Sequence, residues 1–411
     1  MRIAIFSETF LPKWDGVANT LCHLLRHLAD RGHTAIMFAP EGAPKRFAET
    51  PIHGLSCFPC PMYPPLKLVF PQVNVVDQLR EFAPDVVHLV NPALLGPVGL
   101  RHGRELDVPV VASYHTDIPG YAQHYGLGLF RETLWAYFRW MHNGADLNLC
   151  PSRFTQEELE QKGFKRLRVW GRGVDTDRYT PRKRSGEWRD RLSGGRPDAQ
   201  LLLYVGRLAT EKRVAWLRPI LDVLPEARLA IVGDGPERET LAKLFEGTNT
   251  VFTGYLEGEA LASAYAAADI FTFPSASETF GNVVLEAMAS GLPVIAPDAG
   301  GPRDHVHDGK NGYLFPAHDP EALVRRVRRL AARPGLIRSL GWGARAYAKT
   351  QTWEMILDGL IADYQAAIDA HAESGSPVSE GTFARWWSTW RQRGVRTTPP
   401  ARRRSSDPVY S

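Results

Sequence analysis

Short apolar runs alternate with stretches of helical periodicity along most of this 411-residue chain, and this alternation restricts the fold more than any other feature. In the first half, the apolar runs predict strands at residues 2–7, 34–39, 85–90, 108–113, 147–150 and 167–170. A helix between the first two strands is predicted by an apolar stripe that Gly32 ends, formed by Val17, Leu21, Leu24, Leu25 and Leu28. Strands that alternate with helices favour an α/β fold with a doubly wound, mostly parallel sheet.

Residues 181–200 interrupt the alternation, because they are charged, rich in glycine and aperiodic, and they predict a linker. The alternation then resumes, with predicted strands at residues 201–205, 228–232, 250–253, 270–274 and 293–296. We therefore expect two Rossmann-like domains, residues 1–180 and 181–350, that face each other across a cleft. Ligands of such sheets bind at the carboxyl ends of the strands, so the cleft is the expected active site. A last apolar stripe predicts a helix over residues 353–370, and a tail follows from residue 371.

Composition excludes several classes of protein. With 44% hydrophobic and 23% charged residues, the chain is neither disordered throughout nor collagen-like. Four cysteines do not make a disulfide framework in a chain of this length, and a reducing cytoplasm suits them best. Cys57 and Cys60 have redox or half-zinc spacing, but small thiols without such a role are the favoured interpretation. The apolar runs are too short or too interrupted by proline for a membrane span or a signal peptide.

The segment from Ser275 to Gly291 is the most informative for function. Gly281 would let the backbone approach a ligand, and the helix that starts there offers N–H groups to an anion. Glu278 lies just before this helix and Glu286 about one and a half turns inside it, so both could face a ligand over the helix start. Their carboxylates are suited to accepting hydrogen bonds from sugar hydroxyls. A capping carboxylate and a surface charge would explain the same two residues.

Two further strand ends offer polar groups. Arg207 and Lys212 lie five residues apart after the strand 201–205, where two cations can hold a diphosphate, although solvated surface charges are the common alternative. Gly233 and Asp234 form a glycine-rich turn after the strand 228–232, which would let a base or ribose approach.

In the first domain, Gly16 opens a helix directly after a strand and loop, where a phosphate or an acceptor group could bind. His115 follows a strand and is placed for catalysis, although a lone histidine is more often structural. Asp175 and Asp177 form a pair that could hold Mn²⁺ or Mg²⁺ beside a nucleotide diphosphate, but they lie in a polar turn and we expect no metal there.

Taken together, these segments resemble the retaining family-4 glycosyltransferases of the GT-B fold. Four ordered motifs carry the resemblance, namely FLPKWDGVAN, GRLATEKR, VGDGP and SETFGNVVLEAMASGLPVIA with its following GG pair. A narrower resemblance is to sulfoquinovosyl-diacylglycerol synthases and the related bacterial glycolipid mannosyl- and glucosyltransferases. It rests on APDVVHLVNPALLG, VASYHTDIPGYAQHYGLG, HNGADLNLCPS and WGRGVDTDRY.

The resemblance implies a role for each candidate residue. His115 and Glu278 would be the catalytic pair, with Glu278 on the hydroxyls of the transferred sugar. Glu286 would bind the ribose hydroxyls. The remaining donor-binding residues would be Gly16, Arg207, Lys212, Gly233, Asp234, Phe280, Gly281, Asn282 and Val283. The family needs no metal, since arginine and lysine replace it, and the nucleotide sugar is a substrate, so no cofactor is expected. The helix over residues 353–370 would cross back to the first domain.

The expected reaction is the transfer of a hexose from a UDP- or GDP-sugar to a lipid acceptor, such as diacylglycerol or a glycoglycerolipid, with retention. Three alternatives are a non-lipid acceptor, a sugar-nucleotide epimerase of GT-B fold, and a binder that uses a basic tail for nucleic acid. The paired carboxylates and cations argue against the last, so no nucleic-acid partner is expected.

The net charge of +4 has a local origin that bears on location. Residues 381–411 hold seven Arg and one Asp, a charge of +6, so residues 1–380 carry −2. Aromatic side chains at helical spacing precede the last arginines, at Phe383, Trp386, Trp387 and Trp390. This pattern predicts an interfacial helix on the anionic inner face of the membrane, and thus a peripheral cytoplasmic enzyme, although aromatics docked on the enzyme itself would look alike. Residues 134–141 carry a second aromatic stripe, for which core packing competes with an acceptor groove.

Overall fold

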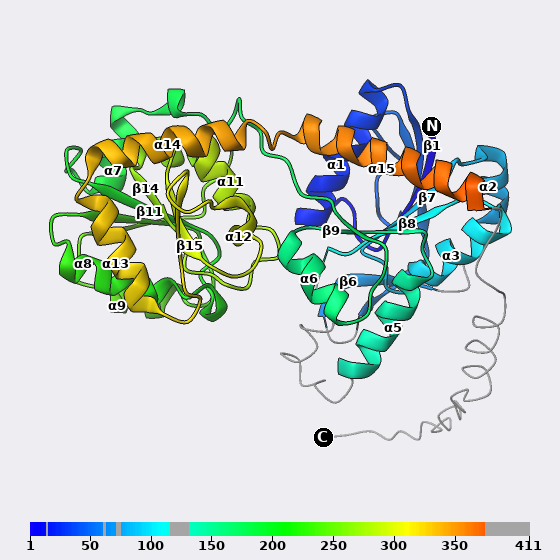
Figure 1. Ribbon diagram of the computed structural model, residues 1–411, viewed down its shortest axis with the longest axis horizontal. Coiled ribbons are helices and arrows are strands. Elements are labelled where there is room, and N and C mark those ends of the chain that lie inside the picture. The colour runs from blue at the N-terminus through cyan, green and yellow to red at the C-terminus, as the bar shows by residue number, and fades with distance from the viewer. Residues whose placement is uncertain (14, 61–62, 71–74, 116–130, 375–411) are drawn as a thin grey trace, which may run out of the picture.

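The computed structural model describes residues 1–13, 15–60, 63–70, 75–115 and 131–374 (Figure 1). Two α/β domains lie side by side along the long axis, each with a central sheet and helices on both faces. This confirms the predicted doubly wound architecture. The predicted start of the tail at residue 371 is too early, because a helix continues to Ser374; residues 375–411 and the segment that follows His115 lie outside the described residues.

The first sheet has eight strands in the order β10-β9-β8-β7-β1-β2-β4-β3, and all neighbours are parallel except β3 and β4. Its strands are β1 (Arg2–Ser7), β2 (Thr34–Pro40), β3 (Arg46–Phe47), β4 (Thr50–Leu55), β7 (Val86–Val90), β8 (Val110–Ser113), β9 (Leu147–Cys150) and β10 (Leu167–Val169). A separate antiparallel pair joins β5 (Cys57–Cys60) to β6 (Tyr63–Val69). The helices are α1 (Gly16–Asp30), α2 (Val76–Phe82), α3 (Leu95–Glu105), α5 (Arg131–Asn143) and α6 (Arg153–Gln161).

The second sheet has six parallel strands in the order β13-β12-β11-β14-β15-β16. They are β11 (Leu201–Val205), β12 (Arg228–Val232), β13 (Thr250–Gly254), β14 (Ile270–Thr272), β15 (Val294–Pro297) and β16 (Gly312–Phe315). Its helices are α7 (Gly186–Ser193), α8 (Arg218–Val223), α9 (Arg238–Leu244), α10 (Gly258–Ala267), α11 (Asn282–Ala289), α12 (Pro302–His305), α13 (Pro320–Ala331) and α14 (Pro334–Ala348), with short 3₁₀ turns at Pro181–Lys183, Thr210–Lys212 and Val214–Leu217. The chain reverses direction across the sheet between β11 and β14, as it does between β1 and β7 in the first sheet, and ligands bind at such switch points.

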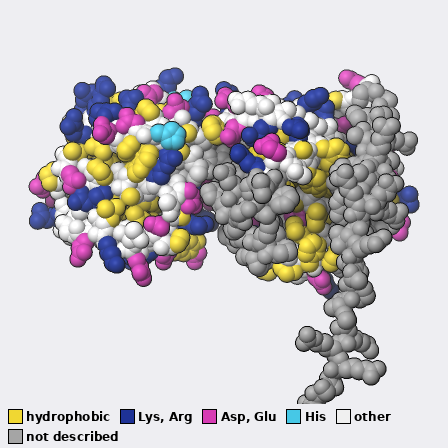
Figure 2. All heavy atoms as spheres, turned by 90° about the horizontal axis from the view of Figure 1, so that it is seen from below, with side chains coloured by type: hydrophobic (Ala, Val, Ile, Leu, Met, Phe, Trp, Pro, Cys, Tyr) yellow, Lys and Arg dark blue, Asp and Glu magenta, His cyan; other side chains and the backbone are white. Residues whose placement is uncertain are grey.

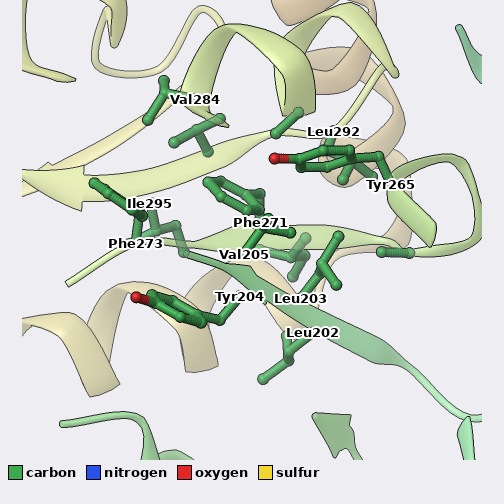
Figure 3. Close-up of a cluster of buried hydrophobic side chains, with 14 of the residues drawn as sticks. Leu202, Leu203, Tyr204, Val205, Tyr265, Phe271, Phe273, Val284, Leu292 and Ile295 are labelled. Carbon is green, nitrogen blue, oxygen red and sulfur yellow. The ribbon is translucent and has the colours of Figure 1, made fainter. Parts of the chain in front are cut away.

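The second domain has a core of aromatic and branched side chains that fixes the strand ends of the site. Figure 3 shows Phe271 of β14 beside Tyr265 of α10, with ring centroids 5.8 Å apart, and Tyr204 of β11 on the other side of its strand; all three side chains are fully buried. The rings of Tyr204 and Phe273 stack with centroids 6.2 Å apart. These contacts hold the ends of β11 and β14 against each other, so the loops that follow them emerge side by side.

Helix α15 (Trp353–Ser374) returns to the first domain (Figure 1). Its residues Leu357, Leu360 and Tyr364 are buried in the same cluster as Leu21 of α1. Arg31, directly after α1, also binds Asp358 at 2.7 Å, so the contact of this segment with α15 is both apolar and ionic. The apolar stripe predicted over this segment is therefore confirmed, and it faces the first sheet.

The interpretation of residues 181–200 as an aperiodic linker is wrong. Helix α7 lies in this segment, and its Arg189 is buried with its guanidinium on Asp269 at 2.8 Å and on three backbone carbonyls. The buried residues of this helix are Arg189, Leu192 and Ser193, so its apolar periodicity is too weak to predict a helix. In α5, by contrast, Trp135, Phe138 and Met141 are buried, so core packing accounts for that part of the aromatic stripe.

Candidate functional site

The two switch points place loops of the two domains at the site. In the second domain, residues 206–212 follow β11 and residues 273–281 follow β14. In the first domain, residues 8–15 follow β1 and lead into α1, while residues 170–174 follow β10 and lead into the second domain. The candidate residues from the sequence lie in or beside these loops, with Gly233 and Asp234 after β12.

An ion pair joins the first two loops. The Nζ atom of Lys212 lies 2.6 Å from Oε1 of Glu278, and both side chains are partly buried. Arg207 lies five residues before Lys212 and its side chain is exposed. Its guanidinium forms no ion pair among the described residues. Lys212 and Glu278 therefore meet as the sequence suggested for residues of one site. Lys212 already shares its charge with a carboxylate, whereas Arg207 is open to an anion.

Helix α11 begins as expected from its glycine. Gly281 is its N-cap, with φ of +90°, and its carbonyl accepts from Val284 N–H at 2.9 Å. Phe280 is buried and its ring meets His305 edge-on at 4.6 Å, while Asn282 is exposed and Val283 partly buried. The packing of Phe280 against His305 therefore fixes the position of the backbone at the start of this eight-residue helix.

The carboxylate of Glu286 is bonded to Tyr265, a residue that was not predicted from the sequence. Its Oε2 atom accepts a hydrogen bond from the hydroxyl of Tyr265 at 2.9 Å. Burial raises the pKa of the Glu286 carboxyl, and the hydrogen bonds of Tyr265 and Tyr179 act in the opposite direction. Two phenol hydroxyls therefore fix the position of this carboxylate before a ligand binds.

The turn after β12 is forced to be glycine-rich by backbone contact. Gly233 has φ of +135°, and a Cβ atom there would lie 2.0 Å from the carbonyl oxygen of Gly206. The carbonyl of Asp234 accepts from Leu208 N–H at 2.9 Å, and its side chain is exposed. The turn therefore packs against the loop that carries Arg207.

On the first-domain side, α1 is capped before any ligand arrives. The carboxylate of Asp15 accepts from the N–H groups of Val17 and Ala18 at 3.0 and 2.9 Å. Gly16 has a different constraint, because a Cβ atom there would lie 2.5 Å from the Nη1 atom of Arg172. The glycine leaves room for that guanidinium.

His115 is buried, with 7% of its surface exposed, and packs edge-on against Trp170 with ring centroids 5.3 Å apart. Both of its ring nitrogens lack a hydrogen-bond partner among the described residues. Burial lowers the pKa of His115 well below its usual range, with a further contribution from the charge of Arg172. The imidazole is therefore neutral at physiological pH, suited to hydrogen bonding with a hydroxyl rather than to carrying a charge.

Arg172 was not predicted as a site residue. This residue lies within WGRGVDTDRY, which was examined for its aspartate pair, although it also follows strand β10 at the carboxyl edge of the sheet. That position was the available signal. The carboxyl of Asp175 is used within its own turn, where it accepts from the N–H groups of Asp177 and Arg178 at 3.1 and 2.9 Å. The described residues contain no group of three or more potential metal ligands.

Polar contacts join the domains beside this site. The backbone N–H of Arg153, at the start of α6, donates to Asp304 of α12, and Arg303 lies 3.8 Å from Glu157. The first-domain segment also passes close to the second domain, since a Cβ atom on Gly171 would lie 3.2 Å from the Phe280 ring. Residues of both domains therefore surround one position.

Comparison with known proteins agrees with this geometry. The model of Glycosyltransferase Family 4 matches residues 14–178, and that of glycosyl transferases group 1 matches residues 199–333. The chain is 39% identical to the sulfoquinovosyl transferase SQD2 of Arabidopsis thaliana, over 89% of this chain and 74% of the relative. It is 40% identical to a GDP-mannose-dependent alpha-mannosyltransferase of Mycobacterium tuberculosis, over 89% and 97%.

A more distant relative is the alpha-monoglucosyldiacylglycerol synthase of Streptococcus pneumoniae, 29% identical over 72% of this chain and 71% of the relative. Among solved structures, that of HepE from Anabaena in complex with UDP superposes with a TM-score of 0.73 at 20% identity, over 89% of this chain and all of the other (100%). At that identity the likeness concerns the fold. Since one family model falls on each domain and close relatives align along most of its length, the chain belongs to the family-4 glycosyltransferases of the GT-B fold.

Proposed function

We propose that this glycosyltransferase moves a hexose from a UDP- or GDP-sugar to a lipid acceptor, with retention of the anomeric configuration. The observation that carries the proposal is the pairing of Lys212 with Glu278 at the switch point, beside Arg207. Cations suit the diphosphate of such a donor, and a carboxylate suits the hydroxyls of its sugar. Relatives named for GDP-mannose and for diacylglycerol support the donor and acceptor classes.

In this proposal each domain has its part. Arg207 and Lys212 bind the diphosphate in place of a metal ion, the start of α11 receives the phosphates on its backbone, and Glu286 binds the ribose. The acceptor hydroxyl attacks the anomeric carbon on the face from which the phosphate leaves. The carbon–oxygen bond to the phosphate breaks, and the acceptor proton passes to the leaving phosphate oxygen. Neutral His115 donates a hydrogen bond to a sugar hydroxyl or accepts one from it.

The test is to incubate the protein with UDP-glucose or GDP-mannose and diacylglycerol vesicles, then to identify products by mass and their anomeric configuration by NMR. An α-linked glycolipid from an α-linked donor is expected, with the rate unchanged by EDTA. A product of inverted configuration would contradict the retaining step. The absence of glycolipid, with sugar transferred to a soluble acceptor instead, would favour the second candidate, a non-lipid acceptor. Epimerised donor without transfer would indicate the epimerase alternative.

Attachment to a membrane surface is a separate part of the proposal and rests on the sequence of the tail. No helix among the described residues has the length and apolarity needed to span a bilayer. On the face shown in Figure 2, acidic side chains lie among the basic ones over most of the second domain, and basic side chains gather at its upper left edge. The tail, with its charge of +6 over residues 381–411, is the segment we propose to bind anionic lipid.

Deleting residues 375–411 leaves α15 intact and should reduce sedimentation with vesicles that contain anionic lipid. A matched variant replaces Trp386, Trp387 and Trp390 by alanine and keeps every arginine, so it separates insertion of the aromatic side chains from charge. Unchanged sedimentation of the deletion variant would contradict the proposed attachment and would leave the transfer reaction unaffected.

A further inference from the structure

Arg172 is a buried cation at the meeting point of the two domains, and no role has yet been given to it. It lies in the segment that connects strand β10 to the second domain, and 8% of its surface is exposed. Its position is fixed from one side, because its Nη1 atom donates to the carbonyl oxygen of Gly16 at 2.9 Å. The absence of a side chain on Gly16 allows this approach.

The guanidinium has far more donors than partners. It carries five N–H groups, and the bond to Gly16 is its one hydrogen bond within the described part of the chain. Its Nε atom is buried and has no partner in the described ranges either. A buried charge without direct partners is costly, and buried cations in proteins are paired or bind anions. Compensation by a ligand is the economical explanation, since Arg189 shows how this protein satisfies a structural arginine, with an aspartate and three carbonyls.

The surroundings of Arg172 come from both domains. Burial lowers its pKa to about 10, and the negative charges of Asp15 and Glu278 act against that shift, so the guanidinium stays charged at neutral pH. Glu278 belongs to the second domain and is held by Lys212. Neutral His115 is close enough for the charge of Arg172 to lower its pKa, and within the described residues its ring nitrogens have no partner. An anion in this place would be next to the sugar-binding carboxylate of the proposed site.

We propose that Arg172 binds the phosphate that leaves the donor sugar, as a cation contributed by the first domain opposite Arg207 and Lys212. This inference rests on the proposed function, and it adds a catalytic residue to it. As the bond from the anomeric carbon to the phosphate oxygen breaks, the electron pair moves onto the phosphate. Arg172 donates hydrogen bonds to that growing charge and keeps its own protons, while the acceptor proton goes to the phosphate. Preorganised donors aimed at such developing charge act mainly on turnover.

The test compares R172M and R172K with the wild type, counting released UDP or GDP, so that it works with whichever acceptor supports turnover. R172M should lower kcat by about 100- to 1,000-fold, the loss typical of one such donor. The Kd of the intact donor should change less than the Kd of UDP or GDP, because the free diphosphate carries the charge that develops as the bond breaks. R172K should recover part of kcat, because the charge remains without the planar fork. Arg168 of strand β10 is the matched control, since it lies just before this segment but is exposed and pairs with Asp363 of α15. R168M should behave as wild type.

A second measurement separates catalysis from mere support of Gly16. Donor analogues with a methylene or a difluoromethylene bridge between the phosphates differ in the basicity of the leaving phosphate. The kcat loss in R172M should be larger with the methylene bridge, whose leaving group is more basic and needs more stabilisation. Equal losses with both donors, or a kcat within about fivefold of wild type, would overturn the proposal. Failure of the wild type to release nucleotide from any donor would instead refute the proposed function.

Discussion

The two sides of the candidate site differ in how their polar groups are partnered. In the second domain, Lys212 is bonded to Glu278 and Glu286 to Tyr265, so these charged groups are partnered before a ligand binds, whereas Arg207 is open. In the first domain, as far as the structure describes it, His115 has no partner on either nitrogen and Arg172 has a single hydrogen bond. A satisfied network is fixed in position, whereas unpartnered buried groups gain most from a ligand. We infer that the second domain holds the donor and the first domain acts on the reacting groups.

The largest effect should come from the unpartnered histidine. H115A should lower kcat by about 100- to 1,000-fold, because it removes a buried hydrogen-bonding group at the site of reaction, with the Kd of UDP or GDP nearly unchanged. Because the pKa of His115 lies well below its usual range, the wild-type rate should show no titration of this residue between about pH 6 and 8. H318A, at an exposed position, is the control. A loss confined to nucleotide affinity would remove the distinction between the two sides.

The next largest effect is expected in the second domain, and it should lower nucleotide affinity more than kcat. E286A should weaken UDP or GDP binding by about 10- to 100-fold, since hydrogen bonds to a charged group contribute about 1.5–3 kcal/mol. Titration calorimetry with the 2′- and 3′-deoxy nucleotides identifies the cause, because the variant should lose little further affinity for them. E239A, on the exposed face of α9, serves as control. Equal losses for ribo- and deoxynucleotides would contradict the ribose role.

Most strands of the two sheets could be predicted from the sequence, whereas some edge strands and helices could not. Continuous apolar runs such as residues 201–205 and 228–232 coincide with β11 and β12, because strands covered on both faces need apolar side chains throughout. Strand β4 was missed since it lies near the sheet edge, with an alternating burial pattern and a proline at position 51. Helix α7 was missed because its apolar periodicity is too weak.

Among the site residues, those in sequence motifs could be predicted and those defined by burial could not. Glu278 and Lys212 were found because they lie in motifs of fixed spacing, and their ion pair confirms that they meet. Arg172 and Tyr265 were missed because their importance depends on burial and on neighbours far apart in the sequence. No local pattern marks an arginine that will be enclosed between two domains, or a tyrosine that will reach a carboxylate 21 positions later. The roles of the individual site residues stay predictions.

A smaller effect tests whether the second-domain network is truly preorganised. Y265F removes the hydrogen bond to Glu286 and should weaken UDP or GDP binding about 2- to 10-fold at neutral pH, in line with about 0.5–1.5 kcal/mol for one hydrogen bond. That bond favours the ionised carboxylate, so its loss raises the pKa of Glu286 further. Binding should therefore fail at a higher pH in the variant than in wild type as the pH is lowered. Y255F, at a side chain that is 72% exposed, is the control, and an unshifted pH profile would show that Tyr265 only fills space.

The smallest expected effect concerns the junction that brings the two sides together. Arg303 and Glu157 lie 3.8 Å apart with 45% and 58% of their side chains exposed, so water and salt screen them. A double-mutant cycle with R303A and E157A, measured by urea unfolding, should give a coupling of about 0.2–1 kcal/mol and leave turnover unchanged. The pair Arg325 and Glu321 within α13, 3.4 Å apart and similarly exposed, gives the reference for a contact that cannot open with the domains. If the junction pair is as weak as this reference, the domains are free to adjust around a ligand, and the unpartnered His115 and Arg172 can close on it. A coupling above about 2 kcal/mol would mean a rigid junction, in which the position of Arg172 is set by the protein whether or not an anion is bound.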